Sequence, residues 1–204
     1  RRDQMSALLP ELLEYMAQDP YGGELGHYPI TSLYYDSPDY KAYWDKLEGH
    51  RNRRKVRVRV YGNEEVTPET MAFVEIKQRV NVRIRKRRFK LPYARAIAFD
   101  EFDAPPEELS QADALVMQEV YYLYRTLHLQ PACVVRYDRM ALEGRDSYAD
   151  LRVTFDTNLR GRVHDLSLLS SSHANDQLLL SPDYVILEVK ANQTVPLWMV
   201  QLIS

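Results

Sequence analysis

Four charged side chains in two short segments alternate with apolar residues. Arg57 and Arg59 alternate with valines in the segment RKVRVRVY, and Glu75 and Lys77 flank an isoleucine in the segment FVEIK. Residues two apart in an extended strand share a face, so each segment presents its charges together. Guanidinium groups bind phosphate oxygens through paired hydrogen bonds and keep their charge at every physiological pH. The chemistry that this pattern favours is therefore the binding of a phosphorylated anion.

A second carboxylate and lysine, Glu188 and Lys190, occur in the segment VILEVK. A Mg²⁺ or Mn²⁺ ion bound with phosphate takes one or two protein carboxylates and completes its shell with phosphate oxygens and water. Glu188 is therefore a candidate metal ligand beside a candidate phosphate contact, and a cross-strand ion pair is its alternative role. We expect Glu75, in the same pattern with Lys77, to orient neighbouring lysines or arginines instead.

The charge of the chain is unevenly distributed. The 204 residues include 27 Lys and Arg and 29 Asp and Glu, for a formal net charge of −2. Residues 51–95 nevertheless contain fifteen basic residues against four acidic ones, a net charge of +11. Arginines outnumber lysines by 20 to 7 in the whole chain. Such asymmetry indicates a concentrated anion site, with a solvated charged sheet face as the alternative.

Other classes of chemistry find little support in the composition. The five histidines are scattered without metal-ligand spacing, and the single cysteine, Cys133, excludes an internal disulfide and a multi-cysteine zinc site. A lone cysteine favours a reducing compartment, so we expect a cytoplasmic location, with the inner face of a membrane as an alternative through a partner. No apolar run reaches the roughly 20 residues of a membrane-spanning helix. We expect no nucleic-acid binding, because the arginines alternate with valine and isoleucine and not with exposed aromatic residues.

Hydrophobic periodicity predicts the elements that must position these charges. An amphipathic helix is expected over residues 3–18, with Pro10 delaying its start. A second helix should begin after Ser110, with Asp113 in its first turn, and end near His128. Its buried stripe should comprise Leu115, Val116, Val120, Leu123, Tyr124 and Leu127. Strands are expected at 30–36, 54–61, 72–79, 82–91, 132–142, 149–156 and 184–190, and a mobile loop at 170–176.

This order of elements lacks the strand–helix–strand repeat of a parallel sheet and predicts an α+β fold with antiparallel strands and peripheral helices. The strands carry Arg-x-Arg and Glu-x-Lys on one face, where like charges destabilise a sheet unless something neutralises them. A single domain over residues 1–204, built around a closed antiparallel barrel whose charged interior binds a polyanion, would account for the pattern.

Seven segments in this order resemble the VTC domain, the polyphosphate polymerase domain of the vacuolar transporter chaperone family, in its bacterial form. That domain belongs to the triphosphate tunnel metalloenzyme superfamily. The segments are SLYYDSPDY, KVRVRVYG, FVEIK, RKRRFKL, RYDRMALEG, DLRVTFDTNL and VILEVK, and they span most of the chain.

The resemblance implies a tunnel that binds ATP and transfers its γ-phosphate to a growing polyphosphate chain, with Mn²⁺ or Mg²⁺ as the metal. The residues that match the phosphate contacts of the family are Arg57, Arg59, Lys77, Lys86, Arg139, Arg152 and Lys190. Five of these would bind the triphosphate of ATP: Arg57, Arg59, Lys77, Arg139 and Arg152. Glu188 matches the metal-binding glutamate.

Two alternatives share the same cationic site, namely a metal-dependent tunnel triphosphatase and a non-catalytic module that binds polyphosphate or nucleotide. The resemblance also implies a membrane protein as a partner of the domain. The family pattern further includes a first Glu-x-Lys strand and a C-terminal Ser-Lys segment. This sequence lacks both, and we expect them in the full protein.

Overall fold

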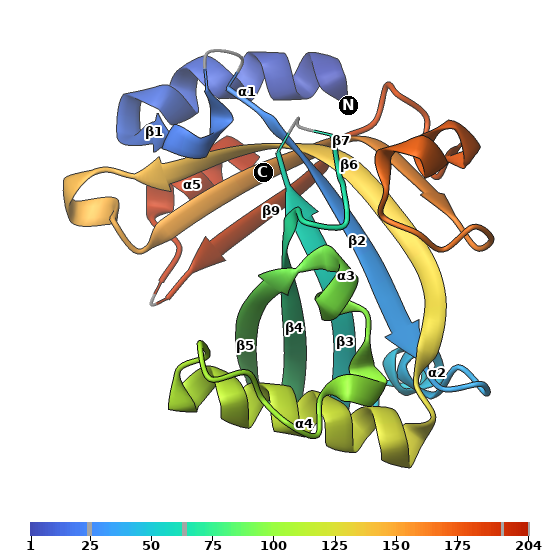
Figure 1. Cartoon of the computed structure of the whole chain (residues 1–204). Coiled ribbons are helices and arrows are strands. Elements are labelled where there is room, and N and C mark those ends of the chain that lie inside the picture. The colour runs from blue at the N-terminus through green and yellow to red at the C-terminus, as the bar shows by residue number, and fades with distance from the viewer. Residues whose placement is uncertain (24–25, 63–64, 193, 204) are drawn as a thin grey trace. The chain divides into compact units, whose positions relative to one another are not determined.

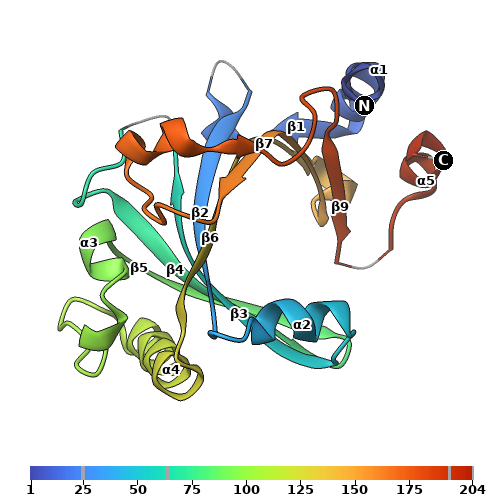
Figure 2. The ribbon, with the colours of Figure 1, turned by 90° about the vertical axis from the view of Figure 1, so that its right-hand side faces the viewer.

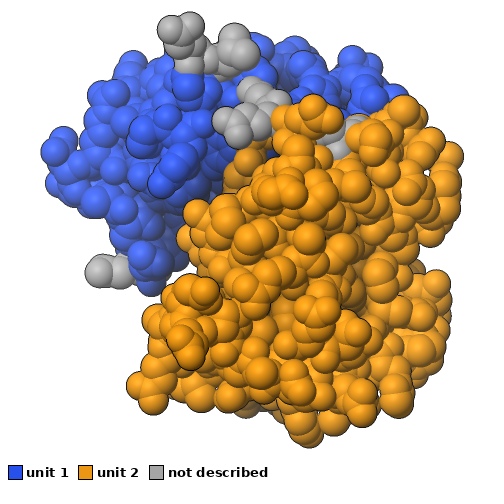
Figure 3. All heavy atoms as spheres, in the orientation of Figure 1, with its two compact units in different colours: residues 1–30, 136–160, 178–204 blue, residues 31–135, 161–177 orange. Residues whose placement is uncertain are grey.

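Hydrophobic residues gather in two separate cores, and each core belongs to one compact unit of the chain (Figure 3). The structure, a computed structural model, describes residues 1–23, 26–62, 65–192 and 194–203. Unit 1 comprises residues 1–30, 136–160 and 178–204, and unit 2 comprises residues 31–135 and 161–177.

Strands and helices alternate irregularly along the chain (Figure 1). The α-helices are α1 (Arg2–Tyr15), α2 (Lys41–Leu47), α3 (Tyr93–Ala96), α4 (Gln111–Leu127) and α5 (Leu197–Ile203). The strands are β1 (Met16–Gln18), β2 (Tyr28–Asp36), β3 (Asn52–Tyr61), β4 (Met71–Val80), β5 (Arg83–Pro92), β6 (Gln130–Gly144), β7 (Leu151–Arg162), β8 (Gln177–Leu178) and β9 (Ile186–Ala191). The strand order is β5-β4-β3-β2-β6-β7-β8, with β1 paired to β6 and β9 paired to β7. The pairs β1–β6, β3–β4, β4–β5 and β7–β9 are antiparallel.

In unit 2, strands β3, β4 and β5 form a meander whose two faces differ sharply. Val56, Val58 and Val60 of β3 are buried in the core, and Lys55, Arg57 and Arg59, which alternate with them, lie on the other face. Direct cross-strand partners in an antiparallel pair lie on the same face. The register places Ile76 and Val74 of β4 and Phe89 of β5 beside these valines, so one face of the meander holds the apolar core, with Arg54, Arg85 and Arg87 toward one end of it. The other face is cationic.

Helix α4 covers the apolar face of the meander (Figure 1). The Ser110 side chain accepts a hydrogen bond from the backbone N–H of Asp113, which caps the helix as the sequence predicts. Most of the predicted stripe is buried or partly buried, but Leu115 is exposed and its place in the stripe is wrong. The buried set instead includes Met117, because the face in contact with the sheet is rotated slightly from the predicted one.

In unit 1, the apolar residues of β7 and β9 pack with residues of α1 and α5. Both helices lie on the same side of β9 in Figure 2. Helix α1 ends at Tyr15, three residues earlier than predicted, because Met16–Gln18 pair with β6 as strand β1. Pro10 lies inside α1 and does not delay its start.

The structure confirms the predicted α+β class with antiparallel strands and peripheral helices. The predicted loop at 170–176 is mostly a 3₁₀ helix, Ser170–Asn175. Across residues 1–23, 26–62, 65–192 and 194–203, no helix has the length and apolar composition needed to cross a membrane.

Candidate functional site

The polar face of the β3–β5 meander is a dense array of cations, called here the cationic face. Its nine basic residues are Arg53, Lys55, Arg57, Arg59, Lys77, Arg79, Lys86, Arg88 and Lys90. The register arranges them in rows across the strands, in which Lys55, Lys77 and Lys86 are direct neighbours. Glu75 is the acidic residue that the three strands contribute to this face. Like charges in direct opposition destabilise a sheet, so the array favours the binding of an anion.

Glu75 is the buried centre of the cationic face, with 1% of its side chain exposed. Its Oε2 lies 2.6 Å from both Nε and Nη2 of Arg57, and its Oε1 lies 2.7 Å from Nζ of Lys86. The Arg88 guanidinium is more distant, at 3.9 Å. Glu75 therefore orients the cations around it, as its sequence pattern suggests.

The ionisation of this centre follows from its charges. Burial by itself would raise the pKa of Glu75, but Arg57 and then Lys86 outweigh burial and lower it below its ordinary value. Burial would likewise lower the pKa of Arg57, but Tyr34 and Glu75 raise it. Both side chains are therefore charged at neutral pH.

Strand β2 supplies hydroxyl groups that hold Arg57 and Arg59 of β3. Tyr34 accepts a hydrogen bond from Nη1 of Arg57 at 3.0 Å, and Ser32 accepts one from Nε of Arg59 at 2.9 Å. Arg59 also lies over the ring of Tyr61, 5.7 Å from its centroid. Neutral oxygens thus help to fix both arginines, and Glu75 also pairs with Arg57.

A cavity of about 390 Å³ opens on the cationic face. Its lining includes Lys55, Arg57, Lys77 and Lys86, together with the buried Glu75. Neither Lys55 nor Lys77 forms an ion pair with a carboxylate in the described part of the chain. A cavity of this size with four converging cations has the charge and the donors to hold several phosphate groups.

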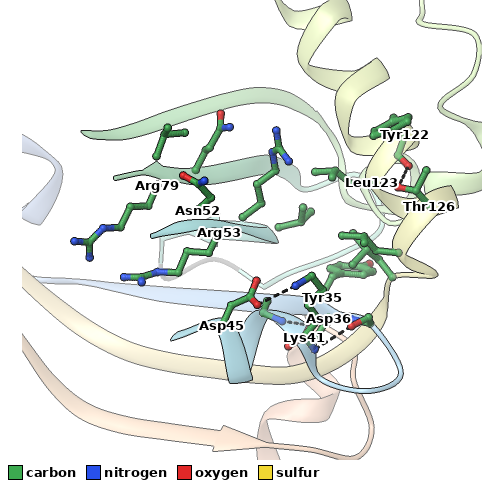
Figure 4. A pocket seen from close by; sticks show the side chains of 18 residues that line it. Tyr35, Asp36, Lys41, Asp45, Asn52, Arg53, Arg79, Tyr122, Leu123 and Thr126 are labelled. Atoms are coloured by element: carbon green, nitrogen blue, oxygen red, sulfur yellow. Dashed lines mark hydrogen bonds and ion pairs between the residues drawn. The ribbon is translucent and has the colours of Figure 1, made fainter. Parts of the chain in front are cut away.

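The cationic face continues beyond this cavity to Arg53 and Arg79, which are direct cross-strand partners. Figure 4 shows their side chains extending in the same direction, away from Tyr122 and Thr126 of α4. Each donates a hydrogen bond to a backbone carbonyl, of His50 and Asn81 respectively, and neither has an acidic partner among the residues that the structure describes.

Unit 1 carries the second group of predicted residues. Arg139 of β6 forms two parallel hydrogen bonds with Asp156 of β7, each 2.7 Å long. Burial would lower the pKa of Arg139, but these bonds raise it. Arg152 forms ion pairs with Asp19, at 2.9 Å, and with Glu143. A phosphate ligand would have to compete with carboxylates for both arginines.

Glu188 and Lys190 lie on one face of β9 and pair with each other at 3.0 Å. Glu188 is 46% exposed, so its carboxylate is accessible to a cation. No group of three potential ligand side chains is present in the described residues. A divalent ion that takes most of its ligands from phosphate and water needs only one or two carboxylates, so this donor set fits Mg²⁺ or Mn²⁺ bound together with phosphate.

The comparison with protein families decides the relationship: the family model described as "VTC domain" matches residues 1–204. The chain belongs to the VTC domain family. No curated protein matches the sequence. Among solved structures, the chain is similar to the crystal structure of a putative adenylate cyclase from Bacillus halodurans, at 15% identity and a TM-score of 0.45. The match covers 79% of this chain and 68% of that one.

The predicted residues of this VTC domain fall into two groups. The cationic face brings together Arg57, Arg59, Lys77 and Lys86. Unit 1 contains Arg139, Arg152, Glu188 and Lys190, of which Arg152 and Lys190 are direct partners between β7 and β9. Their roles in binding remain predictions.

Sequence reasoning missed several residues that shape these groups. Lys55 lies two residues before Arg57, so strand alternation could have placed it on the same face. Ser32 and Tyr34 also differ by two positions, but nothing in the sequence indicates that β2 lies beside β3. Asp19 precedes its partner Arg152 by 133 residues, and no local pattern could have identified that pair.

Proposed function

We propose that this VTC domain is an ATP-dependent polyphosphate polymerase, which transfers the γ-phosphate of ATP to a growing polyphosphate chain. The observation that carries the proposal is the cationic face, where nine basic residues surround one buried carboxylate. Membership of the VTC family supports a domain that binds nucleotide or polyphosphate.

The extent of the cationic face favours a ligand longer than a triphosphate. A nucleoside triphosphate carries about four negative charges at neutral pH. Four cations and the carboxylate of Glu75 line the cavity, and Arg53 and Arg79 lie beyond it on the same face, which gives these residues a net charge of +5. The step from the row of Arg57 to the row of Arg53 is four residues, or roughly 13 Å along the strand. This surplus of charge and length favours a chain of phosphates over a single triphosphate.

The proposed chemistry needs positioning and charge neutralisation more than covalent participation of the protein. Arg57, Arg59, Lys77 and Lys86 would bind phosphate oxygens through charge-assisted hydrogen bonds. Arg139, Arg152 and Lys190 would do the same in unit 1, after exchanging a carboxylate partner for phosphate. Cations in contact with the transferred group would stabilise the negative charge that spreads over it.

The proposed metal ligand is Glu188. Bound Mg²⁺ or Mn²⁺ would neutralise phosphate charge and polarise the phosphorus–oxygen bond. Because Glu188 pairs with Lys190 in the free protein, binding of a cation would release the Lys190 ammonium for a phosphate oxygen.

The test is incubation of the full protein with ATP and Mn²⁺ or Mg²⁺, with products resolved on a polyphosphate gel and free phosphate assayed in parallel. We expect a ladder that an exopolyphosphatase destroys. Release of free phosphate without a ladder would replace the proposal by a triphosphatase. Nucleotide binding without either product would leave a non-catalytic module.

A further inference from the structure

Thr154 of β7 has an unusual environment for a polar side chain. It is 1% exposed, and its hydroxyl has no hydrogen-bond partner among the residues that the structure describes. A buried hydroxyl without a partner costs stability, so most such groups in folded proteins are paired. Valine would fill nearly the same space at this position without that cost.

The position of Thr154 connects it to the phosphate and metal candidates of unit 1. Thr154 alternates with Val153 and Phe155, which lie in the apolar core, so it points to the opposite face of β7. Its direct partner on β9 is Glu188, and the next row on that face pairs Arg152 with Lys190. The side chains of direct partners in an antiparallel pair lie about 4.5–5.5 Å apart at Cβ.

Glu188 and Lys190 are long side chains that pair with each other next to Thr154, and both remain about half-exposed. Such a pair is weak in solvent and separates at little cost. A cation on Glu188 and a phosphate on Lys190 would separate it, because each charge would then have a stronger partner.

We propose that the Thr154 hydroxyl donates a hydrogen bond to a phosphate oxygen of the ligand, at a place that the Glu188–Lys190 pair covers until the ligand separates it. The inference rests on the proposed function, because it takes a phosphate chain as the ligand. It assigns to Thr154 a binding role that explains why a hydroxyl without a partner is kept in a buried position.

The proposal makes stability and affinity change in opposite directions. Thr154→Val removes the unpaired hydroxyl, so we expect the free protein to melt about 2–4 °C higher. The same variant loses one hydrogen bond to a charged ligand, so we expect about tenfold weaker binding of tripolyphosphate. Thr154→Ser retains the hydroxyl and should bind within about twofold of the wild type. If Thr154 had a purely structural role, its substitution would lower the melting temperature and the affinity for tripolyphosphate together, or would lower neither.

The experiment measures the melting temperature of each free protein and its binding of tripolyphosphate by calorimetry, once with Mg²⁺ and once with a chelator. Thr157→Val is the matched control, because the Thr157 hydroxyl donates to the backbone carbonyl of Asp138 at 3.4 Å. We expect that control to leave tripolyphosphate affinity unchanged. Weaker binding by Thr154→Val in both conditions supports contact with phosphate itself.

Three results would overturn the inference. Unchanged affinity of Thr154→Val would show that its hydroxyl has no ligand. A loss limited to the Mg²⁺ condition would place the hydroxyl on the metal and not on phosphate. A lower melting temperature together with weaker binding would indicate damage to the fold. Because tripolyphosphate binding needs no phosphoryl transfer, these results are independent of whether polyphosphate is made.

Discussion

Replacing Glu75 by glutamine removes the acidic centre of the cationic face and should change stability and ligand response together. Glu75 and its partner Arg57 are 1% and 20% exposed, so the pair is largely shielded from solvent. Removing one partner of a buried pair costs about 3–5 kcal/mol. Lys86 and Arg88 are 43% and 50% exposed and add little to this figure.

Because Arg57 retains some contact with water, we expect the lower end of that range, about 3 kcal/mol. For a chain of this size, each kcal/mol lowers the melting temperature by about 2–4 °C. The expected fall for Glu75→Gln is therefore roughly 6–12 °C. A bound phosphate chain would replace the lost carboxylate as counterion of Arg57 and Lys86. Saturating tripolyphosphate should therefore raise the melting temperature of the variant more than that of the wild type.

The assay is differential scanning calorimetry of the wild type and Glu75→Gln, with and without tripolyphosphate. Glu119→Gln is the matched control, because Glu119 pairs with Arg87 and Arg54 away from the cationic face. We expect this control to lower the melting temperature without increasing the shift caused by the ligand. The reasoning is refuted if Glu75→Gln has the same melting temperature as the wild type. It is also refuted if tripolyphosphate raises the melting temperature of the variant by no more than that of the wild type.

Three further predictions concern acid stability, product length and the cap of α4. The pKa of Glu75 in the folded protein is lowered from 4.5, so ionised Glu75 should contribute fully to stability above about pH 4.5. That contribution should disappear as the pH falls through the lowered pKa of the folded protein. The melting temperatures of the wild type and Glu75→Gln should therefore become more similar in acid. Arg53→Gln or Arg79→Gln should shorten the polyphosphate ladder while the KM for ATP stays unchanged, and Arg85→Gln, on the opposite face of β5, should leave the ladder as it is. Polyphosphate ladders of equal length in all three variants would show that Arg53 and Arg79 do not bind the product. Ser110→Ala should cost about 1 kcal/mol through loss of the helix cap, a fall of about 2–4 °C in melting temperature, and no fall would contradict the capping role.

Local patterns predicted most of the elements, because alternation and helical periodicity are properties of neighbouring residues. The division of β3 into valines and arginines was visible directly in RKVRVRVY, and the Ser110 cap followed from residues three apart. The predicted end of α1 was wrong because Met16–Gln18 pair with β6, more than a hundred residues away in the sequence. Such tertiary pairing overrides local helical preference.

The candidate site could be predicted only where its residues lie on single strands. Arg57 and Arg59 are two residues apart, and their common face follows from strand geometry alone. Their oxygen partners Ser32 and Tyr34 come from a different strand, and only the sheet order brings these residues together. The row of Lys55, Lys77 and Lys86 likewise depends on register, which no single segment encodes.

The most direct test of the account compares two arginines of the same meander that lie on opposite faces. Arg57 lines the cavity of the cationic face, and Arg87 pairs with Glu119 on the other side. Calorimetry at one fixed salt concentration should show Arg57→Ala binding tripolyphosphate about 10- to 150-fold more weakly than the wild type, the loss expected for a charged hydrogen-bond contact. Arg87→Ala should bind as the wild type does. An equal loss in both variants, or none in either, would contradict the claim that the cationic face is the phosphate-binding face.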